Sequence, residues 1–408
     1  MAGLTPPYLR GLPCQVPSQP VKRPQTPRAL PETSSAWSST LSMNGSTVRS
    51  RNWAIIRQRV KSTTARKTKS MKIRGKLTSL TLGFGAVPLV IASVLAYVAG
   101  SGALRDSNDQ LLSAIRDAKK QQTELYFKDI QGNLLSLASG TMVPQALSAL
   151  SRGFHQPAAQ QAAVDGEVTG YYRTQFAPKY HESTGNDPDL SQLVPAAPMA
   201  RALQAAYLAT NPHPLGEKHK LDAASDGSEY SATHALYHPA FREYLERQKL
   251  YDIFLIDGET GDVVYTVFKE VDFASNLKSG PFATSGLGEA FRRAAVAREP
   301  GETFLVDFAP YAPSYEAPAS FIATPVFSNG KLLGVLAFQM PVDRVAEMLA
   351  QQAGMGETGE VYLVGRDLLM RSNSRFSETT SILATKVQTE GVEQALAGVT
   401  GVASFEGP

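Results

Sequence analysis

Five polar side chains in the later part of this 408-residue chain could together contact a small ligand: Tyr265, Lys269, Asp307, Tyr311 and Tyr315. The ammonium group of Lys269 could pair with a carboxylate, and the carboxylate of Asp307 with an ammonium. The three tyrosines would supply apolar walls with a hydroxyl group at one end. The structural alternative is that Lys269 pairs with acids on the surface and that the tyrosines pack in a core or a loop.

The histidines offer one spacing that could bind a metal. His234 and His238 are four residues apart, which on a helix would put two imidazoles on one face, with His219 and Glu243 in reserve. Pro239 follows His238 directly and disfavours a helix through both histidines, because a residue before proline avoids the helical conformation. We therefore expect hydrogen-bonded loop histidines, and neither a metal nor any other cofactor.

The sequence offers little else for catalysis or calcium binding. The acidic stretch Asp257–Asp262 lacks the ligand spacing of an EF-hand, whose twelfth position would fall on Phe268, so we interpret it as a hairpin turn. There is no glycine-rich phosphate loop with a lysine, no nucleophile elbow and no paired-histidine metalloprotease motif. We predict no catalytic residues and no enzymatic activity in this chain.

The elements that would position the five side chains form an antiparallel sheet. One hairpin is predicted around the acidic turn and another around Asn329-Gly330, a strong short-range turn signal. The predicted strands are 253–256, 263–268, 304–308, 321–327 and 332–340, with a helix near 287–295 between the hairpins. Five such strands and a helix are the arrangement of a PAS-like module, which we place at 235–345.

Helices and irregular structure should surround this module. A capping box at Ser107 predicts the start of a long helix over 105–150, followed by an irregular or helical covering segment over 151–234. Pro239 suits the first residue of a helix through Phe241. After a connecting helix, Tyr362–Gly365 echoes 254–257, which suggests a second, membrane-proximal module over 346–408. We expect this second module to be incomplete and the output domain to lie further on in a longer reading frame.

The N-terminal region predicts a membrane anchor. Leu77–Leu104 contains no charged side chain, whereas Arg49–Lys76 holds eleven Lys or Arg residues and no acid. About 20 apolar residues suffice to cross a bilayer, and a basic flank stays on the cytoplasmic side. We predict a transmembrane signal anchor over 77–102, in the inner membrane, with residues 105–408 periplasmic or extracellular. A cleaved signal peptide is the alternative, because small residues surround Ala99–Ala103.

Charge and composition separate an N-terminal arm from the rest. Residues 1–100 carry fifteen Lys or Arg and the single acid Glu32, which leaves 25 basic and 36 acidic residues downstream. Residues 1–70 are rich in Pro, Ser and Arg and predict a disordered cytoplasmic arm, although Met71 is an alternative start. The acidic outer part would repel phosphates, so we expect no nucleic-acid partner. Cys14, the only cysteine, lies in the arm and leaves the outer part without a thiol.

Taken in order, these features resemble the double Cache family of bacterial extracytoplasmic sensor domains, found in methyl-accepting chemotaxis receptors, sensor kinases and membrane-bound cyclases. The resemblance covers about Arg105–Pro408 and rests on the anchor, the helix that leaves it and the stretches 251–268, 307–315 and 359–365. It implies that the membrane-distal module binds an amino acid, another carboxylate or an amine, and that the ligand shifts the long helix. The family's amino-acid-binding pattern of Arg, Trp, Tyr and Asp cannot be placed on this chain residue by residue.

The sequence therefore predicts an α+β protein with two PAS-like modules, the second incomplete. Its predicted function is that of a membrane-anchored sensor that binds a small molecule and passes the signal across the membrane. We expect it to form a homodimer through the long helix. The alternative is an anchored or secreted binding protein without a signalling role. A second apolar run and a signalling domain encoded downstream would distinguish the two.

Overall fold

The computed structural model describes residues 72–156, 162–350, 354–377 and 379–404. The prediction for the arm at residues 1–70 lies outside these described residues. Two compact units divide the chain, one containing residues 6–100 and the other, in its described part, residues 101–404. The sheet and the helices that pack on it belong to the second unit, which is the one that positions the candidate site.

Helix α1 (Ile73–Ser139) contains the apolar stretch. Its most apolar window has a mean hydropathy of 2.1 and is wholly exposed, and among the described helices α1 is the one that is long and apolar enough to cross a membrane. The prediction that a helix begins at Ser107 is wrong, because α1 runs through this position. The backbone N–H groups after Ser107 are already paired with carbonyl groups of the preceding helical turn, so they need no capping side chain. The predicted long helix also ends earlier, since Gly140 separates α1 from α2 (Met142–Phe154).

The sheet consists of β1 (Asp252–Asp257), β2 (Val263–Thr266), β3 (Phe304–Tyr311), β4 (Ala317–Ser328) and β5 (Lys331–Met340). Its spatial order is β2-β1-β5-β4-β3, and every neighbouring pair is antiparallel. Both predicted hairpins form, and the register of β3 with β4 shifts between Val306 and Ala309. The predicted α+β class with a PAS-like five-stranded sheet is confirmed.

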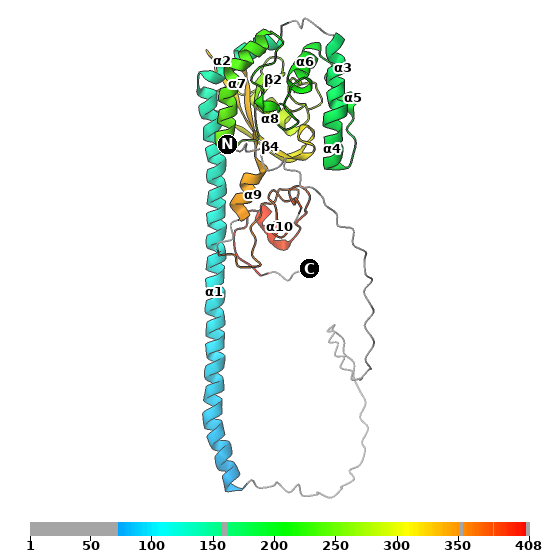
Figure 1. Ribbon diagram of the computed structural model, residues 1–408. Coiled ribbons are helices and arrows are strands. Elements are labelled where there is room, and N and C mark those ends of the chain that lie inside the picture. Colours follow the sequence, from blue (N-terminus) through cyan, green and yellow to red (C-terminus); the bar gives the residue numbers. More distant parts are fainter. Residues whose placement is uncertain (1–71, 157–161, 351–353, 378, 405–408) are drawn as a thin grey trace, which may run out of the picture. The chain divides into compact units, whose positions relative to one another are not determined.

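The sheet separates two hydrophobic cores, because successive residues of a strand point to opposite faces. Ile253 and Leu255 of β1 belong to the first core, together with residues of α1, α2 and α7 (Glu229–Gln248). Phe254 and Ile256 belong to the second core, which is covered by α3 (Ala162–Tyr171) and α8 (Gly286–Ala294). In Figure 1, α2 and α7 lie on the opposite side of the sheet from α3. Both faces are therefore buried.

Short helical pieces connect α3 to α7. They are the π-helices η2 (Tyr172–Phe176) and η3 (Ala205–Ala209), the helices α4 (Ala177–Thr184), α5 (Leu190–Leu193) and α6 (Pro198–Gln204), and the 3-10 helix η4 (Lys218–Lys220). Helix α7 starts at the N-cap Ser228, whose hydroxyl accepts a hydrogen bond from Ser231 N. The prediction that Pro239 begins this helix is wrong. Pro239 lies inside α7, where burial of one face keeps the helix continuous despite the missing N–H.

The last part of the unit contains α9 (Val342–Ala350) and α10 (Glu390–Leu396). Here the predicted strand at Tyr362–Gly365 is present only as an isolated bridge between Val364 and Met370, and a second bridge joins Leu369 to Lys386. The described residues after α9 form no named strand. The proposed second module therefore remains a prediction.

One backbone approach in the sheet gives a stability test. A Cβ atom at Gly334 would lie 2.1 Å from Ile256 O and 2.9 Å from a methyl group of Leu147. The Gly334→Ala variant should lose about 1–3 kcal/mol of unfolding free energy, because β1 and β5 would have to separate. Gly132→Ala, in a helical position with open space around it, should be neutral or gain up to about 1 kcal/mol. Thermal unfolding of both purified variants in detergent checks this, and equal melting temperatures would contradict the close approach.

Candidate functional site

The loop 266–275, between β2 and the turn before α8, is held by Asp252 at the start of β1. Asp252 Oδ1 accepts hydrogen bonds from the backbone N–H groups of Ile253, Val267 and Phe268 at 2.6, 2.8 and 2.9 Å. On the other side of the loop, Gln204 Nε2 donates to the carbonyls of Val271 and Phe273 at 3.1 and 2.8 Å. The loop is thus fixed at both ends by buried polar side chains.

Three acids around this loop form what we call the carboxylate cluster: Asp252, Glu270 and Asp272. All three are buried, with Glu270 the most exposed at 8%. Tyr311 OH, from the end of β3, donates to Asp272 Oδ2 at 2.6 Å. Glu270 accepts from Tyr251 OH at 2.9 Å and from Ser314 Oγ at 2.8 Å. Neutral hydroxyl groups and backbone amides therefore supply the partners of these acids.

The carboxylate cluster has acceptor atoms to spare. Asp252 Oδ2, Asp272 Oδ1 and Gln339 Oε1 are buried without a hydrogen-bond partner in the described part of the chain. Gln339 lies opposite Asp252 in the β1–β5 register, and its amide donates to Ser314 Oγ at 3.3 Å. A buried acceptor without a hydrogen-bond partner lowers the free energy of unfolding, so its presence in a folded protein calls for an explanation.

Burial and mutual repulsion change the acidity of the carboxylate cluster. Burial first, and the charge of Asp272 second, raise the pKa of Asp252 to about 8 and that of Glu270 well above its usual 4.5. Burial also raises the pKa of Asp272 to about 6, while the hydrogen bond from Tyr311 acts in the opposite direction. These acids share one enclosed environment, so their titrations belong to the cluster as a whole.

The ammonium group of Lys269, the one cation in this loop, lies in a cage of aromatic rings. Its Nζ lies 4.4 Å from the ring centre of Tyr265, 5.0 Å from that of Phe273 and 5.7 Å from that of Tyr207. The ammonium donates to Thr266 O. Burial lowers the pKa of Lys269 to about 7, although the charges of Asp252 and Asp272 oppose this. The cage and the carbonyl, rather than an ion pair, stabilise its charge.

The histidines of α7 lie beside this cage. His234 and His238 stack with ring centres 4.4 Å apart, so they share one helix face after all. His238 is held on both ring nitrogens, by Tyr265 OH and by His219 O, each at 2.7 Å. His234 Nδ1 contacts Asp222 O at 2.6 Å, whereas its Nε2 has no partner among the described residues. Burial lowers the pKa of both imidazoles well below 6.5, and the nearby charge of Lys269 adds to this.

Backbone strain accompanies these side chains. Lys269 and Ala274 have φ angles of 65° and 61°, and Tyr315 and Glu316 have φ angles of 57° and 60°. None of these is a glycine, so each costs of order 1 kcal/mol and persists only because its surroundings fix it. The strained positions lie within the loop that contains Glu270 and directly after Ser314, one of its two hydrogen-bond partners.

The structure brings together four of the five residues predicted from the sequence, on two sides of the loop. Tyr265 and Lys269 form the cage on the first core, and Tyr311 binds the carboxylate cluster on the second. Tyr315 is half-buried near that cluster, where its ring lies 5.6 Å from that of Phe176 and the charge of Glu270 helps to raise its pKa. Whether any of them contacts a ligand remains a prediction.

Asp307 is separate from these four. Its carboxylate pairs with Arg371, whose Nε and Nη2 donate at 3.1 to 3.2 Å, and the same guanidinium also binds Asp367 at 2.9 Å. The side chain of Asp307 is 64% exposed and that of Arg371 only 10%. Asp307 therefore joins β3 to the segment after α9 instead of facing the loop.

Sequence reasoning missed Asp252, Glu270 and Asp272. The available signal was the run from Lys269 to Asp272, where two acids two residues apart are embedded among Val and Phe side chains directly after a buried strand. Charged residues in such an apolar context are seldom on an ordinary solvated surface. Within the described residues, no group of three or more His, Cys, Asp or Glu side chains could hold a metal ion.

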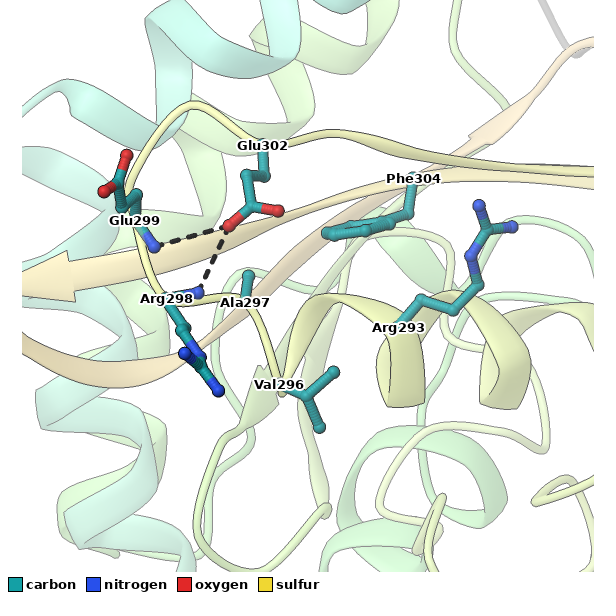
Figure 2. Close-up of a pocket in the computed structure, with 7 residues that line it drawn as sticks. All are labelled: Arg293, Val296, Ala297, Arg298, Glu299, Glu302 and Phe304. Atoms are coloured by element: carbon teal, nitrogen blue, oxygen red, sulfur yellow. Dashed lines mark hydrogen bonds between the residues drawn. The ribbon is translucent and has the colours of Figure 1, made fainter.

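A pocket lies elsewhere, at the C-terminal end of α8 and the turn before β3 (Figure 2). Glu302 Oε1 accepts from the backbone N–H groups of Arg298 and Glu299 at 3.2 and 3.4 Å, as the dashed lines in Figure 2 show. Arg293 donates to Leu305 O at 3.0 Å and lies over the ring of Phe304. Its lining is largely exposed and contains none of the five predicted residues, so we do not assign the ligand site there.

No protein-family model and no curated protein matches the chain. Solved structures similar to it are ligand-binding domains of sensors. The domain of the Pseudomonas fluorescens chemoreceptor CtaA with L-serine is 15% identical, with a TM-score of 0.25 over 45% of this chain and 63% of that domain. The chain thus spans less than two thirds of that domain.

Two further structures are of the same kind. The sensor domain of the V. cholerae histidine kinase DctB is 13% identical, with a TM-score of 0.27 over 55% of this chain and 67% of that one. The sensory domain of the Campylobacter jejuni chemoreceptor Tlp3 with isoleucine is 10% identical, with a TM-score of 0.28 over 65% and 82%. Similarity at this level carries no argument about function, which has to rest on the site.

The buried histidines predict acid sensitivity. Because the folded protein keeps His234 neutral well below pH 6.5, only the unfolded chain takes up that proton, and unfolding free energy is lost as the pH falls from about 6.5 towards the folded pKa. Each such histidine contributes a slope of up to about 1.4 kcal/mol per pH unit. His234→Phe should therefore show a shallower loss of stability with acid.

Chemical unfolding at a series of pH values between 7 and 5 measures these slopes. His181→Phe is the control, because it makes the same side-chain replacement at an exposed position of α4, and the slope should change more in His234→Phe than in this control. An unchanged slope in His234→Phe would show that this imidazole does not titrate on unfolding.

Proposed function

We propose that this protein is a membrane-anchored extracytoplasmic sensor that binds a small molecule at the carboxylate cluster of the module at 235–345. The observation that carries the proposal is three buried acids with no paired cation among the described residues, two of which have an oxygen without a hydrogen-bond partner. Replacing such buried charges with apolar residues often stabilises a protein. Their presence, together with perturbed acidity and strained backbone, is what a binding site requires.

A ligand would reach the cluster through the second core, because its members are buried and a covering element has to move. The π-helices η2 and η3 are suited to this. Tyr172 OH, in η2, donates to Gln204 Oε1 at 3.1 Å, and Gln204 in turn holds the loop. Single π-helical turns are frequent at functional sites because they are local distortions of an α-helix. The ligand class remains that of the sequence prediction, an amino acid, an organic acid or an amine.

The proposed topology follows from α1 and its basic flank. The apolar part of α1 is exposed over its whole most apolar window, and eleven basic residues precede it in Arg49–Lys76. This combination favours an anchor with the N-terminus in the cytoplasm and the sheet on the outer side.

We also propose that α1 mediates a homodimer. Leu104, Leu111 and Leu125 are exposed at 74%, 44% and 57% and are separated by multiples of seven residues, the repeat by which helices pair along one seam. A second copy would cover this stripe.

Strand β3 connects the proposed site to the segment after α9. Tyr311 at one end of β3 binds the carboxylate cluster, and Asp307 in the same strand pairs with Arg371. A movement of β3 on ligand binding would therefore displace Arg371 and the residues around it. We propose that this ion pair helps to pass the signal towards the membrane-proximal segment.

A thermal-shift screen of the purified chain in detergent against amino acids, organic acids and amines tests the function. A ligand at a hundred times its dissociation constant stabilises the fold by about 2.7 kcal/mol. Asp272→Asn and Tyr311→Phe should weaken any hit, whereas Asp187→Asn, on an exposed loop, should not. If a hit is undiminished in both cluster variants, the ligand binds elsewhere.

Amide hydrogen exchange tests the connection through Arg371. Asp307→Asn should accelerate exchange in residues 362–387 roughly two- to fivefold, because a largely exposed partner contributes about 0.5–1 kcal/mol. The exposed Arg366→Gln is the control and should leave this segment unchanged. Unaltered exchange in Asp307→Asn would mean that the ion pair does not hold the segment.

A further inference from the structure

The electrical balance of the carboxylate cluster is unusual. Asp252, Glu270 and Asp272 share one enclosed space, and no lysine or arginine lies within ion-pair distance of them among the residues that the structure describes. The ammonium of Lys269, in the same loop, donates to Thr266 O and lies in the aromatic cage, so the charges of Asp252 and Asp272 act on it without an ion pair. If all four groups were ionised, the loop would bury a net charge of −2. An uncompensated buried charge is removed most readily by binding a proton.

The groups that face the cluster come from every element around it. Strand β1 and the residue before it contribute Asp252 and Tyr251. The loop contributes Lys269, Glu270 and Asp272, and β3 with the turn after it contributes Tyr311, Ser314 and Tyr315. Strand β5 contributes Gln339, and the covering helices contribute Tyr171 and Tyr172. Apart from Lys269 these groups are neutral hydroxyls or amides, so none supplies a compensating positive charge.

The hydrogen bonds indicate which acid can carry the proton. Asp252 Oδ1 accepts three backbone N–H groups, which can only donate and therefore favour its charged form. Both oxygens of Glu270 instead contact hydroxyl groups, those of Tyr251 and Ser314. A hydroxyl group can donate or accept, so the surroundings of Glu270 accommodate either protonation state by rotating O–H bonds.

We propose that Glu270 holds a proton in the ligand-free protein and that a cationic group of the ligand displaces it. The second half of this inference rests on the proposed function. In the step, the O–H bond of the Glu270 carboxyl group breaks, the proton passes to bulk water, and the carboxylate remains beside the incoming ammonium. The net charge of the cluster is the same before and after. The sensor would therefore select cations and bind them more tightly as the pH rises.

The direction of the pKa shift agrees with a bound proton. Burial, with the charge of Asp272 as the second cause, raises the pKa of Glu270 well above 4.5. Burial also raises the pKa values of Asp252 and Asp272, so the assignment to Glu270 rests on the hydrogen bonds. A positive charge beside the carboxyl group acts in the opposite direction and favours release of the proton.

Infrared spectroscopy of the full chain without ligand tests the bound proton. The wild type at pH 7 should show the C=O stretching band of a protonated carboxyl group, and Glu270→Gln, which has the shape of the neutral acid, should lose the part of this band that Glu270 contributes. Glu259→Gln, in the hairpin turn between β1 and β2, is the control and should retain the band. If the spectra of the wild type and of Glu270→Gln are the same in the region of this band, the proposal is overturned.

Calorimetric titration tests the displacement, with n-propylamine, γ-aminobutyrate and propionate as probes in two buffers of different ionisation enthalpy. The two amines should release about one proton each, and their affinity should rise about tenfold per pH unit. Both effects should vanish in Glu270→Gln. Propionate carries no ammonium group and should release no proton. Amine binding without proton release, or binding of propionate alone, would overturn the displacement.

The two proposals fail separately. If the infrared band is present but neither amine binds, the displacement is overturned, and the wider thermal-shift screen alone decides the proposed function. If that screen yields a hit that ignores the cluster variants, the site is wrong although the proton is real.

Discussion

The site depends on one oxygen atom, Asp252 Oδ1, which accepts three backbone N–H groups. Backbone donors inside a protein have to be paired, and the end of a strand leaves some of them without a ladder partner. Here the partner is a carboxylate at the start of the neighbouring strand, so β2 ends and the loop turns at a position that β1 determines. The turn places the later residues of the loop, including Lys269 in its cage and Asp272 at the hydroxyl group of Tyr311.

The loop 266–275 contains several features that lower the stability of a fold. It contains non-glycine residues with positive φ, buried acids with unused acceptor atoms and a lysine in an aromatic cage. The compensation comes from elsewhere. Two large cores cover both faces of the sheet, and Gln204, which lies outside the sheet, closes the loop with two hydrogen bonds. Such an arrangement concentrates strain at one place and distributes the stabilising contacts over the whole unit.

Features with local causes could be predicted from the sequence. The two hairpins follow from turn residues such as Asn329-Gly330 and from Asp257, whose carboxylate accepts from the N–H groups of Glu259 and Thr260. The apolar context of the run from Lys269 to Asp272 indicates buried acids, but the partners of Glu270 could not be predicted, because Tyr251 and Ser314 are brought to it only by the fold. The ion pair of Asp307 could not be predicted for the same reason, since Arg371 is 64 residues away. The helix start predicted at Pro239 was wrong, because burial of one face of α7 outweighs the preference of proline for the first turn of a helix.

The loop 266–275 packs against both hydrophobic cores. Val267, Phe273 and Ala274 belong to the first core, and Val271 belongs to the second. A substitution on one side of the loop therefore shifts the backbone that carries the side chains on the other side, and the energetic effects of paired substitutions across the loop will not add. The carboxylate cluster and the aromatic cage of Lys269 are thus coupled in stability through the backbone that they share.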